Sequence, residues 1–320
     1  MKYFSLCIRS VPDLYRTQDE WWRTVAVCGI TIRRGRANDK RGTAKVALQH
    51  ILVLALVQGL TEFLPVSSSG HLVLTSRVLG WPDQGVIIDI GVHVGTLLAV
   101  TVYFWRDVAR VTIGSMRLVT FRGGPDARLA IMLLIATLPI VLVGFLARDI
   151  VSTAFRSVEL IAWATIGFGL LLWLADRIGM TVQRIEHVGA FGALAIGLAQ
   201  VLALIPGTSR SGITMTAGRF LGMERPEAAR FSMLLSIPTI VGAGTLAGLE
   251  VWETGDIQLG YDVLVAVGLS FVAGIASIAV MMRWLQTAGF GPFVIYRIAL
   301  GILLLWWVYG SSLPLPAAAS

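Results

Sequence analysis

The sequence predicts an all-α polytopic membrane protein, with about six full transmembrane helices and two broken, re-entrant helix pairs. Three observations predict this class. Only 14% of the 320 residues are charged and 56% are hydrophobic, whereas soluble domains carry about 25% charged residues. Several apolar stretches reach the roughly 20 residues that a helix needs to cross a bilayer. Two further apolar stretches are interrupted by small polar residues at matching places.

Residues 1–45 form a basic extension that we expect to be poorly ordered. They hold ten basic and four acidic residues, so most of the net charge of +7 lies there. Cys7 and Cys28, the chain's only cysteines, also lie there and form neither a disulfide framework nor a metal-ligand spacing. Because no basic stripe with interleaved aromatic residues follows, we expect no nucleic-acid partner. Residues 46–310 are expected to be a single membrane-embedded catalytic domain, and 311–320 a short tail.

Six stretches are apolar over about the length of a full span: 86–104, 129–147, 158–175, 228–249, 261–282 and 290–310.

Charged residues between the spans predict the orientation, because cytoplasmic loops carry an excess of Lys and Arg. The expected loop 105–128 carries five arginines and is placed in the cytoplasm. The segment 250–262 carries four acidic residues and no basic residue, so it is placed outside. This path also places the basic extension outside, which runs against the same rule.

The two interrupted regions, 46–79 and 189–221, are related to each other. Proline and glycine end helices, so each region is expected to dip into the membrane and turn at its break. A shift of 142 positions superimposes identical residues: Leu56, Gln58, Leu60, Ser67, Ser69, Gly70, Arg77, Leu79 and Gly80 on Leu198, Gln200, Leu202, Ser209, Ser211, Gly212, Arg219, Leu221 and Gly222. We read this as an inverted repeat, and matched broken helices indicate a binding site near the midplane of the membrane.

Charged side chains at the two breaks are the first candidates for function, because a charge inside the bilayer costs about 2.5–3.5 kcal/mol. Glu62 and His71 flank the first break, and Arg210 lies in the second. Hydroxyl groups surround them: Ser67, Ser68, Ser69, Thr208, Ser209 and Ser211, with Thr214 one turn further on. His93 and Asp89, four residues apart, either support this site or bond within the bundle.

This combination of side chains suits a phosphate ligand. An arginine binds phosphate oxygens with a planar fork, helix N-termini offer free amides, and Gly207 lets the backbone approach closely. A serine can attack phosphorus while a histidine carries the proton. Glu62 can act as a base or as a ligand of a divalent cation such as Mg²⁺ or Ca²⁺.

The two motifs also resemble those of a known family. Glu62-Phe63-Leu64-Pro65-Val66-Ser67-Ser68-Ser69-Gly70-His71 and Pro206-Gly207-Thr208-Ser209-Arg210-Ser211-Gly212 are similar to the two motifs of the bacterial undecaprenyl-diphosphate phosphatases, the bacitracin-resistance family. The resemblance extends from about Leu48 to Tyr309. It implies a hydrolase of the bacterial plasma membrane that removes the terminal phosphate of undecaprenyl diphosphate, regenerating the lipid carrier for peptidoglycan synthesis. It further implies a divalent cation and a site open to the extracytoplasmic side.

Residue by residue, the resemblance gives each candidate a role. The family's acidic motif maps to Gln58 and Glu62 as metal ligands, with glutamine where the family accepts either Glu or Gln. The hydroxyl nucleophile maps to Ser68, the essential histidine to His71 and the phosphate-binding arginine to Arg210. The motif leaves open whether serine or histidine attacks phosphorus.

Three other functions are alternatives to the phosphatase. A transporter or flippase of polyprenyl phosphate would use the same inverted-repeat site without cleavage. A phosphatidic-acid phosphatase type of enzyme would need a further histidine where Met215 and Thr216 stand, so we reject that class. A scaffold has only the N-terminal extension in its favour. The expected partners are undecaprenyl diphosphate and membrane lipid, and the sequence leaves a homodimer open.

Overall fold

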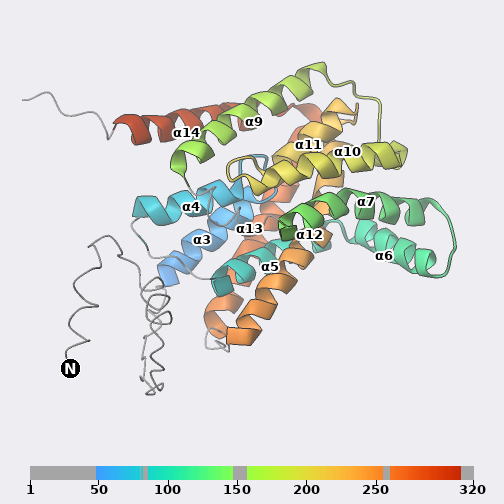
Figure 1. Cartoon of the computed structure of the whole chain (residues 1–320), viewed down its shortest axis with the longest axis horizontal. Coiled ribbons are helices and arrows are strands. Elements are labelled where there is room, and N and C mark those ends of the chain that lie inside the picture. Colours follow the sequence, from blue (N-terminus) through green and yellow to red (C-terminus); the bar gives the residue numbers. More distant parts are fainter. Residues whose placement is uncertain (1–47, 80, 82–85, 147–156, 255–259, 311–320) are drawn as a thin grey trace, which may run out of the picture. The chain divides into compact units, whose positions relative to one another are not determined.

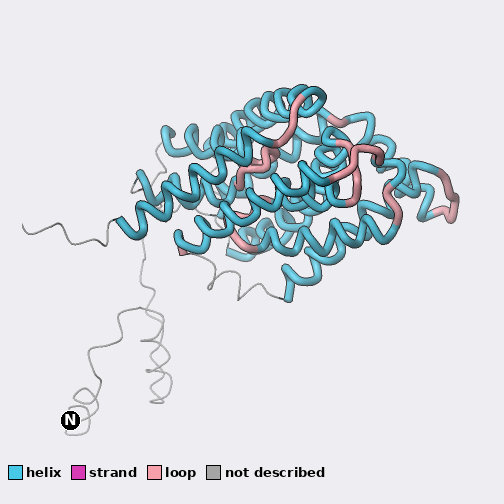
Figure 2. Tube along the Cα trace, turned by 90° about the horizontal axis from the view of Figure 1, so that it is seen from above, coloured by secondary structure: helices cyan, strands magenta, loops and turns pink. Residues whose placement is uncertain are grey.

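The structure is a computed structural model that describes residues 48–79, 81, 86–146, 157–254 and 260–310, so the expectations for 1–45 and 311–320 lie outside it. Figure 2 shows that the described residues are almost entirely helical. They form α3 (Leu48–Thr61), α4 (Ser68–Leu79), α5 (Val86–Tyr103), α6 (Trp105–Val119), α7 (Pro125–Leu146), α9 (Val158–Ile178), η1 (Ile185–His187), α10 (Ala190–Val201), η2 (Leu202–Leu204), α11 (Arg210–Phe220), α12 (Arg225–Thr254), α13 (Gly260–Thr287) and α14 (Gly291–Gly310).

Four described helices are long and apolar enough to cross a membrane. They are α7, α9, α14 and the Tyr261–Thr287 part of α13. The pair α5 and α6 passes the same test together but is bent by 91°, which gives up to five spans. The multi-pass helical class is therefore confirmed, whereas the described residues do not confirm the predicted number of six full spans.

The predicted repeat is present in the helix boundaries. The helices that follow the breaks begin at Ser68 and Arg210, 142 positions apart. The first member of each pair packs on a helix of the other half: α3 lies against α13, and α10 lies against α7 (Figure 1). The two halves therefore interlock, which brings their breaks together in the interior.

The segment 105–128 is not the loop that its arginines suggested. Residues Trp105–Val119 form α6, an amphipathic helix that packs against α7 (Figure 1). Val108 and Val111 face the core from one side of α6, and Asp107 on that side is bound by Arg230 of α12. Arg106 and Arg117 are exposed on the other faces of α6, and Arg110 pairs with Asp107, so a helical period of 3.6 residues explains both the apolar and the charged positions.

The main hydrophobic core holds the first break in place. Phe63, directly after Glu62, has no exposed surface and packs in one cluster with residues of α5, α7, α12 and α13. Phe231 and Phe290 are equally buried in this cluster. Burying such a side chain stabilises the fold by about 1.5–3 kcal/mol. Packed helices therefore support the side of the site that faces the hydrophobic core.

Candidate active site at the two helix breaks

Two short loops break the helix pairs, and both carry site residues. The first break loop, Glu62–Ser67, joins α3 to α4, and the second, Ile205–Ser209, joins η2 to α11. Pro65 and Pro206 lie within them, and a proline cannot supply the amide hydrogen that a continuing helix needs.

Ser67 and Ser209 end the two loops with the same local structure. Their φ angles are 74° and 70°, a left-handed conformation that residues other than glycine seldom adopt. Each side-chain oxygen accepts a hydrogen bond from the amide three residues on, at 3.4 Å from Gly70 and 3.1 Å from Gly212. These are N-caps of the helices that follow. The sequence repeat is therefore also a structural repeat at the site.

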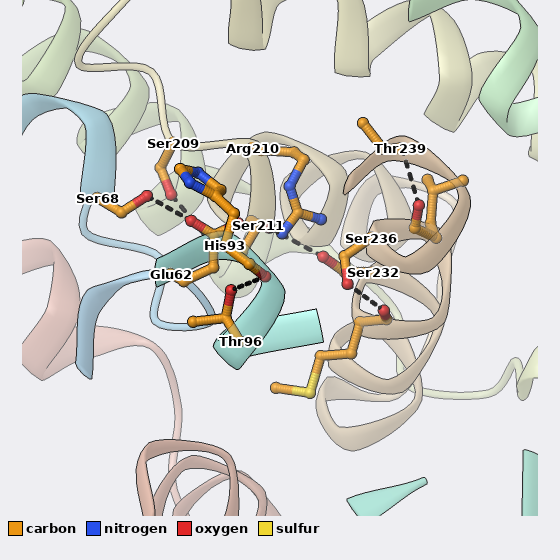
Figure 3. A network of polar contacts seen from close by, with 12 residues as sticks. Glu62, Ser68, His93, Thr96, Ser209, Arg210, Ser211, Ser232, Ser236 and Thr239 are labelled. Carbon is orange, nitrogen blue, oxygen red and sulfur yellow. Dashed lines mark hydrogen bonds and ion pairs between the residues drawn. The ribbon is translucent and has the colours of Figure 1, made fainter. Parts of the chain in front are cut away.

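Glu62 is the centre of the site and connects both loops (Figure 3). Its Oε1 accepts from Arg210 Nη2 at 2.8 Å, an ion pair that links the two breaks. Its Oε2 accepts from the Ser68 hydroxyl at 2.6 Å and from Gln58 Nε2 at 2.9 Å. With only 8% of Glu62 exposed, the carboxylate needs these partners, because an unpaired buried charge is costly. Glu62, Gln58, Ser68 and Arg210 thus form one connected cluster, as the sequence predicted.

The second break loop and the start of α11 offer donors without a partner. Arg210 Nη1 and the Thr208 hydroxyl are buried and make no hydrogen bond within the described part of the chain. An unpaired buried donor costs about 1–3 kcal/mol. Binding of an anionic oxygen would recover that cost, and the free side of a guanidinium fork suits a phosphate.

The other predicted phosphate-binding hydroxyls already have protein partners. Ser211 donates to the Leu64 carbonyl at 2.9 Å and lies 3.2 Å from the Ser209 hydroxyl. Thr214 pairs with Ser232 of α12 at 2.6 Å between oxygens. In Figure 3 the hydroxyl residues Ser232, Ser236 and Thr239 follow one another along α12 on the Arg210 side of Glu62. The side chain of Ser69 lies outside the described structure.

His71 lies on α4 but is bonded away from Ser68. Its Nδ1 is 2.7 Å from the Ser67 carbonyl oxygen, and its Nε2 is 2.6 Å from the Tyr296 hydroxyl of α14. In the described structure the proton acceptor that contacts Ser68 is Glu62. The sequence had associated His71 with the proton and had left Glu62 as either a base or a metal ligand.

His93 of α5 lies near Glu62 in Figure 3. Its Nδ1 is 2.7 Å from the Asp89 carbonyl oxygen, so the bond from His93 goes to the backbone of Asp89. The helical spacing of the two residues predicted that they lie close to each other, and Figure 3 places His93 near the site.

Arg297 of α14 is the residue that sequence reasoning missed. It has no exposed surface, and its guanidinium donates to carbonyl oxygens of both break loops and of α9. These are Pro65 at 3.3 Å, Gly207 and Thr208 at 2.9 Å, and Thr165 at 3.0 Å. The sequence did contain a signal for Arg297. An arginine within the apolar stretch 290–310 places a charge inside the bilayer, at the same cost in free energy as for Arg210.

Gly207 permits the close approach of the second break loop to α9. Its φ is +94°, and a Cβ at this position would lie 2.5 Å from the Ile161 carbonyl oxygen. Any side chain would therefore force the loop away from α9. The structure thus gives Gly207 a packing role, and its close approach to a phosphate stays a prediction.

The predicted metal ligands fit a divalent cation only as part of a larger ligand set. Within the described residues no group of three His, Cys, Asp or Glu side chains could hold a metal. Glu62 supplies one carboxylate, and Gln58 Oε1 is a buried oxygen with no hydrogen-bond partner among these residues. Mg²⁺ is usually bound by one or two carboxylates together with substrate phosphates and waters. Glu62 and Gln58 fit that pattern, and the cation stays a prediction.

Comparison with known proteins places this geometry in a family. The family model described as "Bacitracin resistance protein BacA" matches residues 51–303, which contain both break loops and α14 up to Leu303.

Curated relatives match over the same large part of the chain. "Undecaprenyl-diphosphatase 1" of Rhodospirillum rubrum is 50% identical over 272 residues, which cover 82% of this chain and 95% of the relative. "Undecaprenyl-diphosphatase" of Jannaschia sp. is 49% identical over 266 residues and is covered completely, with 82% of this chain. The protein of the same name from Alteromonas mediterranea is 46% identical over 265 residues, with the same coverage of both chains.

Proposed function

Because the chain belongs to the bacitracin resistance protein BacA family, we propose that its two break loops form the site that hydrolyses undecaprenyl diphosphate. The chain is an undecaprenyl-diphosphatase, a membrane hydrolase that yields undecaprenyl phosphate and inorganic phosphate. This reaction returns the lipid carrier to peptidoglycan synthesis and accounts for resistance to bacitracin. The names of the relatives give no support to the transporter alternative.

The Glu62 cluster is the observation that carries the assignment to this site. It combines a hydroxyl bonded to a carboxylate, through Ser68, with an arginine that has a free buried N–H. A nucleophile with a base beside it is needed for cleavage, whereas binding alone needs only the arginine. The two groups come from different halves of the repeat and meet at one carboxylate.

In this arrangement Ser68 is the nucleophile and Glu62 the first proton acceptor. The Ser68 oxygen attacks the terminal phosphorus, and its proton moves to Glu62 Oε2, 2.6 Å away. The bond between that phosphorus and the bridging oxygen breaks, and undecaprenyl phosphate leaves. Water then hydrolyses the phosphoserine to release inorganic phosphate. His71 is the candidate proton carrier for this second step, and attack by its ring instead of Ser68 is the competing route.

Arg210 stabilises the charge that develops on the transferred phosphoryl group. Its Nη2 holds Glu62, and Nη1 is available to a phosphoryl oxygen. A fixed donor aimed at developing charge is typically worth a factor of 10²–10³ in turnover. The Thr208 hydroxyl, also unpaired and buried, is the second donor of the same loop.

A divalent cation completes the proposed site. Glu62 and Gln58 Oε1 would hold it together with oxygens of the diphosphate. Such an ion, when bound, would neutralise phosphate charge.

The protein is a multi-pass membrane protein. We propose in addition that it lies in the bacterial plasma membrane, with the site open to the extracytoplasmic side and the acidic segment 250–262 outside. The prenyl chain would stay in lipid while the diphosphate reaches the break loops.

Phosphate release from a polyprenyl diphosphate in detergent tests the function. The natural sequence should release phosphate, and both EDTA and the change Ser68→Ala should abolish release. Ser115→Ala is the matched control, because Ser115 lies at an exposed position of α6 and its hydroxyl bonds to the Val111 carbonyl of the same helix. A natural protein that binds the lipid but releases no phosphate with any divalent cation would refute the proposal.

A further inference from the structure

His71 and Tyr296 join two helices that are far apart in the sequence. The Tyr296 hydroxyl lies 2.6 Å from His71 Nε2, short for a hydrogen bond. Their rings stack with centroids 5.7 Å apart and planes within 11° of parallel. Both the hydroxyl and the ring of Tyr296 therefore contact the histidine.

The partners of the imidazole select one tautomer. Nδ1 lies 2.7 Å from the Ser67 carbonyl oxygen, which can only accept, so Nδ1 carries the hydrogen. In the neutral ring Nε2 then has the lone pair, and Tyr296 donates to it. If the ring gains a proton at Nε2, the tyrosine oxygen can accept instead. The Tyr296 contact is therefore compatible with both protonation states of His71.

Burial does not explain why Tyr296 adopts this position. The residue is 45% exposed, and within the described part of the chain its hydroxyl bonds to His71. Its neighbour Arg297, by contrast, is fully buried and bonded to the carbonyls of Pro65, Gly207 and Thr208. Arg297 thus fixes α14 against both break loops, and Tyr296, the residue before it in the helix, reaches His71 from that fixed position.

We infer that Tyr296 is a positioning residue for His71 in the phosphatase reaction. Its hydroxyl holds the imidazole at Nε2 while the Ser67 carbonyl holds it at Nδ1, so the ring is already oriented, with its lone pair on Nε2, when the diphosphate arrives. Pre-set orientation of a catalytic group lowers the barrier without new contacts to substrate. The inference rests on the function proposed above and adds a residue outside the two sequence motifs.

The change Tyr296→Phe tests the inference, because it keeps the stacked ring and removes only the hydroxyl. Turnover (kcat) should fall about three- to tenfold, the scale of one neutral hydrogen bond. KM should stay within about twofold, because the hydroxyl does not bind the substrate. Tyr103→Phe is the matched control, since it removes an exposed hydroxyl from α5 and should leave both constants unchanged.

A spectroscopic measurement separates positioning from a general loss of structure. The ¹⁵N resonance of His71 Nε2, assigned by its disappearance in His71→Gln, should shift in Tyr296→Phe toward that of a nitrogen without a hydrogen bond. Tyr103→Phe should leave it in place. A shift together with reduced kcat supports the inference.

Two results would overturn it: an unmoved Nε2 resonance in Tyr296→Phe, or a moved resonance with unchanged kcat. If the proposed function itself is wrong, the result is different: the natural sequence releases no phosphate, and this is seen before any variant is compared. That result would also remove the reaction for which His71 is positioned.

Discussion

Ser67 and Ser209, 142 positions apart, share the same strained backbone conformation and cap the helices that follow in the same way. Their φ angles differ by only a few degrees, and each oxygen accepts from the amide three residues on. Strain of this kind costs about 1–3 kcal/mol and persists where the surrounding structure imposes it. Its recurrence at both breaks indicates that the site geometry itself requires the left-handed turn.

Ser209→Gly and Ser209→Ala should separate strain from capping. Glycine relieves the left-handed strain and loses only a few tenths of a kcal/mol as a cap, so thermal stability should be retained or rise. Alanine keeps the strain and loses the cap, which should lower stability by about 1–2 kcal/mol. Thermal unfolding in detergent gives the ranking Gly above Ala, and the reverse ranking would contradict this account of the turn.

Arg297→Met should destabilise the protein more than any change at Arg210. The methionine fills much of the volume but leaves carbonyl oxygens of both break loops and α9 without their donor. Each unsatisfied buried group costs about 1–3 kcal/mol. We expect a clear drop in the unfolding temperature together with lost activity. Arg122→Met, on an exposed arginine, is the control, and an unchanged unfolding temperature in Arg297→Met would show that the contacts do not hold the loops.

Gln58→Glu should make the enzyme more dependent on its cation. The change places a second carboxylate beside Glu62, where the amide Nε2 now donates at 2.9 Å. Two adjacent carboxylates repel each other without a cation and bind one more tightly when it is present. We expect lower stability in EDTA and half-maximal activity at a lower Mg²⁺ or Ca²⁺ concentration. Identical cation titrations for both proteins would argue against Gln58 and Glu62 as ligands.

The sequence was sufficient to predict the broken helices and the residues that meet there. Proline, glycine and serine at equal spacing fix where each helix stops, and the few charges in apolar surroundings identify Glu62 and Arg210. These signals are local, so they can be recognised in the sequence without knowledge of the tertiary structure. The 2.8 Å ion pair between the two residues agrees with that prediction.

Features that depend on tertiary contacts were missed or misassigned. Residues 105–119 were expected in a loop because their charges were counted, although Val108 and Val111 carry the helical period that packs α6 on the core. Arg297 was overlooked because the residues around it in its span are strongly hydrophobic. Its partners are carbonyl oxygens, which any residue type supplies, so no sequence pattern could identify them. The Tyr296 contact with His71 spans 225 positions and has the same origin.

Turnover of Arg210→Ala on a polyprenyl diphosphate tests the central claim most directly, namely that both break loops act in one phosphatase site. The account predicts a fall in kcat of at least about a hundredfold, the scale of one lost electrostatic stabiliser. Arg210→Lys keeps the positive charge beside Glu62 and so serves as a second variant in case Arg210→Ala misfolds. Its kcat should fall about tenfold or more, because lysine lacks the planar fork of arginine. Arg122→Ala controls for loss of an exposed arginine. Near-normal turnover of a folded Arg210→Ala enzyme would contradict the account.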